Sequence, residues 1–391
     1  MRMSLPPHRT LRIAMLTHST NPRGGVVHAM QLSETLTSLG HEVVLHAPDA
    51  KGAGFFRQPS CGVACIAVPP APADMTQMVE QRIADYVDYF RRAGTDGFDL
   101  FHAHDGISGN ALATLKLERL IPNFARTVHH IDQFADPHLM ALQDRAIDAA
   151  DIFFAVSRLW QDRLRDERGI EATVVGNGVD TNRFSPAWSG EQVALRDRLQ
   201  LGSGPIFLSV GGIEARKNTL GILEAFRQVR AIRPDAQLVI AGGVSLLDHG
   251  DYQEEFRSCL ACLGRDAAAV HVTGAIADAD MPSLYRLADA LVFPSIKEGF
   301  GLVVLEAMAS GIPVVTSSIA PFTEYLGPGD AIWCDPHHPV SIAEGMALAL
   351  VAPIREQIIP RGLAVAARHG WKQTATAHLA RYHTLLEPDH A

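Results

Sequence analysis

Short apolar runs alternate with longer amphipathic stretches along most of the chain. The runs have the length of buried strands, roughly four to eight residues, and the stretches between them repeat apolar positions with helical spacing. The first unit is a strand over 11–17, a helix over 26–39 that ends at Gly40, and a strand over 41–47. This β-α-β order predicts a parallel sheet with right-handed crossovers.

Two series of such units follow one another. The first adds strands at 63–68, 100–103, 125–128 and 152–156 and helices at 75–92 and 139–150. The second has strands at 206–210, 237–241, 270–272, 290–293 and 314–316 and helices at 220–232, 251–263, 280–287 and 302–309. A turn at 177–180 and a linker at 186–190 separate the series, and a last helix covers 371–386. We therefore expect an α/β protein of two Rossmann-like domains facing across a cleft, because open parallel sheets bind ligands beyond the carboxyl ends of their strands.

Composition and charge narrow the function classes. A length of 391 residues suits two domains, and the formal net charge of -9 with a pI near 6.0 disfavours nucleic acid as a partner. The chain has no apolar run of about 18 residues, so we expect no transmembrane segment. Its five cysteines are too sparse for a disulfide framework and favour a reducing compartment. We expect a cytoplasmic protein, free or held at the inner face of the membrane.

The stretch from 294 to 317 carries the most informative chemistry. It predicts a helix of about three turns that starts at Gly299 and Gly301 and is stopped by Gly311. Small residues at a helix start leave backbone N–H groups open to an anion. Glu306 stands on this otherwise apolar helix, and a carboxylate there needs polar partners.

A ligand that carries a diphosphate and vicinal hydroxyls would satisfy both features. Its phosphate would bind the helix start, Glu306 would bind a ribose, and Glu298 would face the other end of the ligand. The alternative is that Glu298 only complements the helix dipole and that Glu306 lies at a solvated edge.

The same stretch resembles the donor-site signature of the retaining GT-B glycosyltransferases of family 4. The similarity rests on Pro294-Ser295, Glu298-Gly-Phe-Gly301, Glu306-Ala-Met-Ala309 and Gly311-Ile-Pro-Val-Val315, including two Glu residues eight positions apart. It implies transfer of a sugar from a nucleoside diphosphate sugar to an acceptor hydroxyl with retention, with no metal and no cofactor besides this co-substrate. It also implies that Gly299, Phe300, Gly301 and Glu306 bind the donor and that Glu298 holds the donor sugar.

Three more positions match the family in part. Gly24 and Gly25 follow the first strand and are expected at the donor phosphates and the acceptor, or else form only a tight turn. Lys217 matches the family's lysine, but the usual arginine position is Gly212, so Arg216 is expected to take over the neutralisation of the leaving diphosphate.

A histidine position in the first series also matches. His129 resembles the histidine that the family points at the donor sugar, and the alternative is an interior histidine with satisfied hydrogen bonds. His102 and His104 share one face of a strand and could hold a metal, although no further ligand cluster accompanies them.

The sequence thus predicts a hexosyltransferase whose catalytic residues are His129, Arg216, Lys217 and Glu298. Residues 1–186 with 371–391 would form the acceptor domain, and 187–370 the nucleotide-sugar donor domain. The acceptor stays open among a small molecule, a glycan and a lipid. Two rivals remain: a GT-B-type nucleotide-sugar epimerase or nicotinamide oxidoreductase, and a non-catalytic nucleotide-sugar-binding protein.

Overall fold

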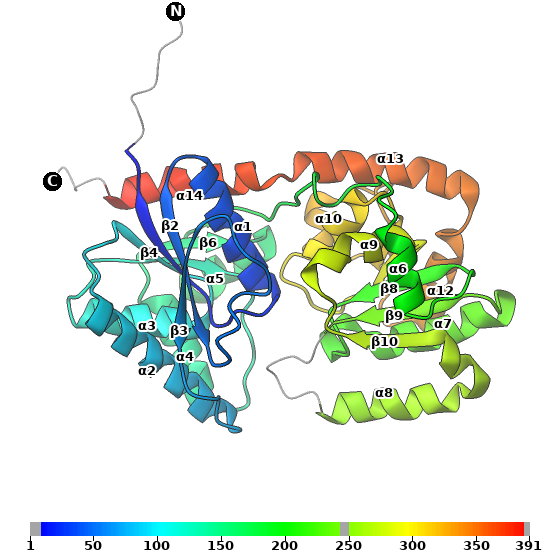
Figure 1. Ribbon diagram of the computed structural model, residues 1–391, viewed down its shortest axis with the longest axis horizontal. Coiled ribbons are helices and arrows are strands. Elements are labelled where there is room, and N and C mark those ends of the chain that lie inside the picture. Colours follow the sequence, from blue (N-terminus) through cyan, green and yellow to red (C-terminus); the bar gives the residue numbers. More distant parts are fainter. Residues whose placement is uncertain (1–8, 243–249, 387–391) are drawn as a thin grey trace, which may run out of the picture. The chain divides into compact units, whose positions relative to one another are not determined.

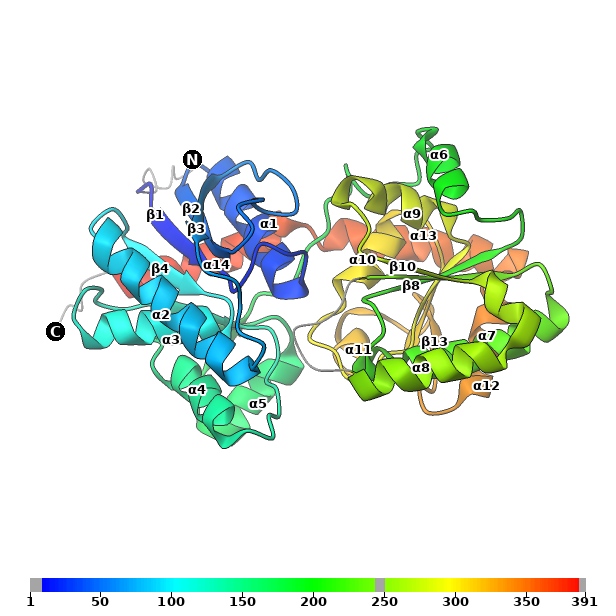
Figure 2. The same ribbon diagram turned by 60° about the horizontal axis from the view of Figure 1, so that its bottom comes forward.

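The computed structural model describes residues 9–242 and 250–386 (Figure 1). The chain divides into two compact units, one made of residues up to 177 together with those from 371 onward, the other of residues 178–370. Each unit is an α/β layer structure with a parallel sheet covered by helices on both faces (Figure 2). The predicted fold class is confirmed.

The first unit contains a seven-stranded sheet in the order β3-β2-β1-β4-β5-β6-β7, and every pairing is parallel. Its strands are β1 Arg12–Leu16, β2 Glu42–Asp49, β3 Gly62–Ala67, β4 Leu100–Ala103, β5 Ala125–Val128, β6 Ile152–Ala155 and β7 Ala172–Val174. The strand order reverses between β1 and β4. Loops at such a switch point diverge and leave room for a ligand.

The helices of the first unit are α1 Gly24–Ser38, α2 Met75–Ala93, α3 Gly106–Leu117, α4 Pro137–Asp148, α5 Arg158–Arg168 and α14 Trp371–Leu386. Alternate residues of β1 serve two separate cores. Ile13 and Met15 pack with α1 and α14, whereas Ala14 and Leu16 pack with α2 and α3. The C-terminal helix α14 therefore completes the core of the first unit.

The second unit contains a six-stranded parallel sheet in the order β10-β9-β8-β11-β12-β13. Its strands are β8 Ile206–Val210, β9 Gln237–Ala241, β10 Val270–Gly274, β11 Ala290–Phe293, β12 Val314–Ser317 and β13 Ile332–Cys334. Its helices are α6 Glu191–Arg198, α7 Thr219–Ile232, α8 Gly250–Cys262, α9 Met281–Leu287, α10 Leu302–Ala309, α11 Phe322–Tyr325, α12 Pro339–Leu348 and α13 Ala352–Arg368. Short 3-10 turns cover Ala215–Lys217, Gly264–Ala269 and Asp278–Asp280. The switch point lies between β8 and β11.

The boundary between the units differs from the predicted one. Residues 178–190, expected as the end of the first domain and a linker, belong to the second unit. Phe184 is buried, the Val179 N–H donates to the His369 carbonyl, and a Cβ built on Gly311 would lie 2.9 Å from Pro186 Cγ. These contacts fix the segment to the second unit although its composition is that of a linker.

Candidate functional site

Two loops meet at the switch point of the second sheet. The loop after β8 carries Lys217, and the loop after β11 carries Glu298. The two side chains form a close ion pair, and both are buried, with side-chain exposures of 9% and 10%. Lys217 Nζ also lies 4.3 Å from the centroid of the Phe293 ring. Two predicted site residues are thereby brought together by neighbouring strands.

Glu298 makes polar contacts with two further residues. Arg216 Nη1 lies 3.5 Å from Glu298 Oε2, and the Gly299 N–H donates to Oε1 over 3.0 Å. Burial alone would raise the pKa of Glu298, but the opposite charges of Lys217 and Arg216 outweigh it and hold the pKa at about 2. Burial lowers the pKa of Lys217, and its pairing with Glu298 opposes this effect. The carboxylate is therefore ionised, and it orients both cations.

Arg216 has a second anchor that the sequence reasoning missed. Its Nε lies 2.9 Å from Oε2 of Glu214, whose side chain is only 3% exposed. The sequence shows an acidic residue two positions before this arginine, and once such a residue is buried it needs a cationic partner. The guanidinium is thus held between Glu214 and Glu298.

The start of α10 is partly as predicted. Gly301 is the residue before the helix and has φ +93, and a Cβ on it would lie 2.5 Å from Phe322 Cε1, so glycine is required there. The helix has eight residues, just over two turns rather than the expected three. The Gly299 N–H is not open, because Glu298 accepts its hydrogen bond. The Phe300 ring is buried and stacked on Tyr325, with centroids 4.7 Å apart.

Glu306 lies on α10 and has the polar partner that the sequence required. The Tyr285 hydroxyl, from α9, donates to Glu306 Oε2 over 2.7 Å. Burial raises the pKa of Glu306, an effect that the Tyr285 hydrogen bond and the charge of Arg183 oppose. Arg183 in turn pairs with Asp278 over 2.7 Å. Tyr285 and Arg183 were missed because their contacts are distant in the sequence.

In the first unit, His129 follows β5 and contacts the start of α1. A Cβ built on Gly25 would lie 3.3 Å from His129 Cδ2, whereas one on Gly24 would meet nothing within 4 Å. The two glycines, expected in a turn before the helix, are its first two residues. The His28 ring packs edge-on against His129, with centroids 4.9 Å apart. Gly25 and His129 therefore lie together, at the strand ends where ligands of such sheets bind.

Behind this edge lies a group of buried histidines. His102 bonds Tyr382 over 2.6 Å and Thr127 over 2.9 Å, and Thr127 lies 3.4 Å from His378 Nε2. The His28 ring bonds the Asn177 amide oxygen over 2.5 Å. Burial lowers the pKa of His28 to about 4 and that of His378 to about 3. Both ring nitrogens of His102 have protein partners that also fasten α14 to the sheet.

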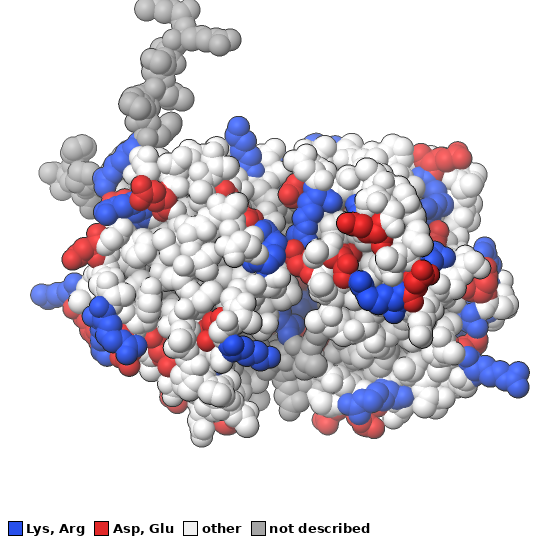
Figure 3. All heavy atoms as spheres, viewed as in Figure 1, with Lys and Arg blue, Asp and Glu red and all other residues white. Residues whose placement is uncertain are grey.

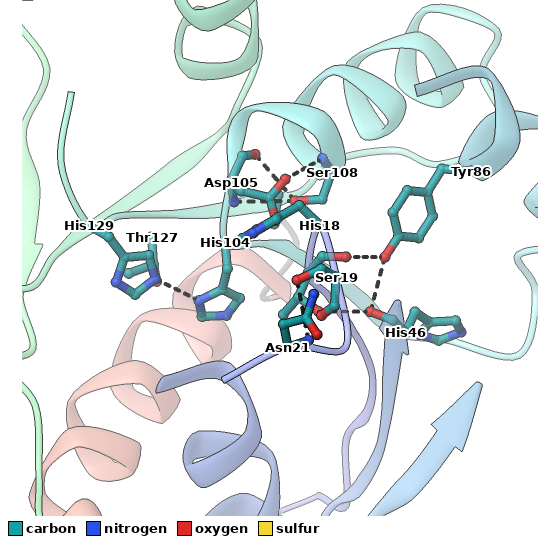
Figure 4. Close-up of polar contacts among 12 residues, drawn as sticks. His18, Ser19, Asn21, His46, Tyr86, His104, Asp105, Ser108, Thr127 and His129 are labelled. Atoms are coloured by element: carbon teal, nitrogen blue, oxygen red, sulfur yellow. Dashed lines mark hydrogen bonds and ion pairs between the residues drawn. The ribbon is translucent and has the colours of Figure 1, made fainter. Parts of the chain in front are cut away.

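The neighbouring loops add polar groups at the same end of the sheet (Figure 4). Asp105 caps α3 by accepting from the Ser108 N–H over 2.8 Å, and His18 Nδ1 lies 3.7 Å from Asp105 Oδ2. His104 Nδ1 lies 3.2 Å from His129 Nε2, as the dashed line in Figure 4 shows. Hydroxyl-rich ligands suit an edge of this kind, which offers carboxylate, imidazole and backbone groups.

The face drawn in Figure 3 shows no large patch of one charge. On the face drawn in Figure 3, acidic and basic side chains are interspersed over both units. Among the residues that the structure describes, no helix has both the length and the apolar character needed to cross a bilayer.

Comparisons with known proteins agree with this architecture. The family model "Glycosyl transferases group 1" matches residues 194–362, and "Glycosyltransferase Family 4" matches residues 22–183. The chain is 26% identical to a D-inositol 3-phosphate glycosyltransferase of Arthrobacter over 96% of both chains. It is 26% identical to a phosphatidyl-myo-inositol mannosyltransferase of Mycobacterium tuberculosis, over 96% of this chain and 97% of the relative.

A solved structure shares the fold. Anabaena HepE, crystallised with UDP and glucose, superposes with a TM-score of 0.74 at 19% identity, over 96% of this chain and 99% of HepE. The two family models fall on the two α/β series, with the boundary of each close to that of a unit. The chain belongs to glycosyltransferase family 4: it is a GT-B-fold enzyme that transfers a sugar from a nucleotide-sugar donor, in a family whose typical chemistry retains the anomeric configuration.

Proposed function

We propose that residues 178–370 bind the donor through the residues around α10, and that Lys217, Arg216 and Glu298 act at the bond that breaks. The observation that carries the proposal is the group formed by these three side chains at the switch point of the second sheet. Cleavage of the donor leaves negative charge on the diphosphate. Two cations already held at that edge stabilise this charge without reorganisation.

Each end of the donor has a matching group. Glu306 accepts hydrogen bonds from the ribose hydroxyls, with Tyr285 orienting its carboxylate from 2.7 Å. The backbone of Phe300 and Gly301 contacts the phosphates, the Gly299 N–H orients Glu298, and Glu298 holds hydroxyls of the donor sugar. Phe300 supports this segment through its stacking on Tyr325.

The acceptor side belongs to the first unit in this proposal. Gly24, Gly25 and His129 lie at the carboxyl ends of β1 and β5 and contact the transferred sugar and the attacking hydroxyl. The acceptor oxygen forms the new glycosidic bond on the face from which the diphosphate departs. Its proton passes to a phosphate oxygen of the leaving group, so no side chain has to serve as the base.

We also propose an inositol-type polyol as the acceptor, free as its phosphate or joined to a lipid. Two relatives are named for such acceptors. Asp105 and His18 offer hydrogen bonds to ring hydroxyls at the same edge. The proposal places the enzyme in the cytoplasm, free or at the inner face of the membrane, with no nucleic-acid partner, in keeping with five unpaired cysteines and mixed surface charge.

The experiment is a two-stage screen. Thermal unfolding is first measured with UDP-, GDP- and ADP-sugars, where a bound donor at 100 times its Kd adds about 2.7 kcal/mol to the free energy of unfolding. The stabilising donor is then incubated with inositol phosphate, with phosphatidylinositol vesicles and with glucose 6-phosphate. The product's anomeric configuration is read by NMR. No stabilisation by any nucleotide sugar, or an inverted product, would contradict the proposed function.

A further inference from the structure

Three side chains from adjacent strands of the first sheet form a hydrogen-bonded row. Met15 lies in β1, His104 follows β4 and His129 follows β5. His104 Nε2 lies 2.8 Å from Met15 Sδ, and His104 Nδ1 lies 3.2 Å from His129 Nε2. His104 is only 3% exposed and Met15 is fully buried, so the row is shielded from water up to His129.

The chemistry of the three groups assigns the protons in this row. A neutral imidazole has one N–H donor and one acceptor nitrogen, whereas a thioether sulfur carries no hydrogen and can only accept. The contact with Met15 therefore requires the hydrogen of His104 on Nε2. His104 Nδ1 is then an acceptor, and the hydrogen bond to His129 requires His129 to donate from its Nε2. The opposite assignment would direct a nitrogen lone pair at the sulfur.

Both rings stay neutral under ordinary conditions, because burial keeps the pKa of His104 and of His129 well below the usual range. Neighbouring histidines, His28 and His102 among them, lower both pKa values further. The His129 ring also packs against Gly25 and against the His28 ring, whose centroid lies 4.9 Å away. Its orientation is thus set by packing, and its tautomer by the row.

We infer that Met15 and His104 are positioning residues that fix His129 as the Nε2–H tautomer, so that His129 Nδ1 works as a hydrogen-bond acceptor in the reaction. This inference rests on the proposed contact of His129 with the donor sugar. An acceptor nitrogen can bind a sugar hydroxyl, which has a hydrogen to donate. It cannot bind a phosphate oxygen, which has none. His129 therefore recognises the sugar and not the leaving diphosphate.

The main test is the tautomer itself, read from long-range ¹H–¹⁵N spectra of histidine-labelled protein at pH 7.5. His129 is assigned by the signals missing in His129→Ala. The expected result is the Nε2–H pattern in the wild type and a mixture of tautomers in Met15→Leu, which keeps the volume but removes the acceptor. Met30→Leu is the matched control, because Met30 is fully buried in the same core and should leave the pattern unchanged.

A second variant and a kinetic measurement complete the test. His104→Phe keeps a ring but removes the acceptor and should also give mixed tautomers. With the donor found in the screen, Met15→Leu should lower kcat about 2- to 10-fold, with KM little changed, while Met30→Leu keeps both values. An Nδ1–H pattern in the wild type, or an unchanged pattern in Met15→Leu, would overturn the inference. Full turnover by His129→Ala would instead refute the proposed sugar contact, with the tautomer result left standing.

Discussion

Lys217 and Glu298 form a buried ion pair that joins the loop after β8 to the loop after β11. Removing one partner of a buried pair leaves an uncompensated charge and typically costs about 3–5 kcal/mol. We expect Lys217→Met and Glu298→Gln each to lower the free energy of unfolding, and the double variant to lose less than the sum. The coupling should be about 0.5–3 kcal/mol. Urea unfolding of the wild type, the two single variants and the double variant measures this coupling energy.

A solvent-exposed ion pair provides the control for this double-mutant cycle. Arg227 and Glu224 form an ion pair of ordinary length on the surface of α7, with side-chain exposures of 56% and 43%. Arg227→Met should change stability little, because solvent screens an exposed pair. Additive effects of Lys217→Met and Glu298→Gln would contradict the pairing. Turnover should be lost in both single variants whatever their stability.

The two cations proposed to lie at the leaving group predict that removal of metal ions has little effect on turnover. Lys217 and Arg216 lie together at Glu298, where a divalent ion would otherwise neutralise a diphosphate. We expect turnover to persist after dialysis against EDTA, within about 2-fold of the untreated enzyme, since the positive charge is supplied by the protein. Loss of activity on dialysis, restored by Mg²⁺ or Mn²⁺, would contradict this expectation.

The buried histidines predict a steep loss of stability in mild acid. The folded-state pKa of His28 is about 4 and that of His378 about 3, against an ordinary value of 6.5. Above pH 6.5 both states are neutral, so these groups have no effect. As the pH falls below 6.5 the unfolded chain binds protons that the folded protein cannot, and stability is lost until the folded pKa is reached. For His28 alone the loss amounts to about 3 kcal/mol.

This pH dependence is measured by urea unfolding between pH 7.5 and 5. His378→Gln should reduce the slope of stability against pH, because one proton-binding difference is removed. His337→Gln, at an exposed position, should leave the slope unchanged. Equal slopes in wild type and His378→Gln would show that the buried ring does not contribute. Glu298 acts in a more acidic window, between its ordinary pKa of 4.5 and about 2, where its stabilisation is lost as the pH falls.

Substitution of the two glutamates of the donor signature should affect different steps, nucleotide binding for Glu306 and turnover for Glu298. Glu306→Ala should weaken nucleotide binding by about 10- to 100-fold, because a hydrogen bond to a charged group contributes about 1.5–3 kcal/mol. Tyr285→Phe keeps the ring and should weaken binding less, since it only releases the Glu306 carboxylate. Glu298→Ala should lower mainly kcat. Calorimetry with the free nucleoside diphosphate and steady-state kinetics measure the two effects. Unchanged affinity in Glu306→Ala would refute the ribose contact.

Much of the architecture was predictable because buried parallel strands are visible in the sequence as short apolar runs. The strands over 100–103, 125–128, 237–241 and 290–293 were predicted with the observed bounds. The helices α3, α5, α6, α11, α12 and α13 and the strands β7 and β13 were not predicted. Helix α3 is an example, since eight of its residues are buried and it shows little amphipathic contrast. A helix buried on most sides lacks the polar face on which a periodicity argument depends.

The candidate site was predictable where the signal is local, and less so where it depends on tertiary contacts. Glu298 and Glu306 could be named from their positions around the predicted helix and Lys217 from its match to the family's lysine, but the pairing of Lys217 with Glu298 could not. Glu298 was expected to face a ligand, and it binds Lys217 and the Gly299 N–H. Tyr285 meets Glu306 only on folding, and the burial that makes Glu214 need Arg216 also arises only on folding. A single sequence holds no signal for such pairs beyond the general need of a buried charge for a partner.

In the loop after β8, the arginine of this chain stands at position 216 and not at position 212. Gly212 has φ +79, and a Cβ built on Gly242 would lie 2.3 Å from Gly212 N, so the backbone here is both left-handed and crowded. A side chain at 212 would cost about 1–2 kcal/mol from the backbone alone. We expect that Arg216→Ala lowers kcat about 10²-fold or more, as removal of one charge-stabilising group does, and that adding Gly212→Arg does not restore it.

The same geometry makes Glu214 a test of how Arg216 is held. Because Arg216 Nε lies 2.9 Å from Glu214 Oε2, Glu214→Gln should loosen the guanidinium and lower kcat by less than Arg216→Ala. In the double variant Glu214→Gln should add almost nothing, since the residue it orients is gone. Steady-state kinetics of the wild type, Glu214→Gln, Arg216→Ala and the double variant test this expectation. Independent effects of the two substitutions, or rescue by Gly212→Arg, would mean that Arg216 does not carry the charge at the leaving group.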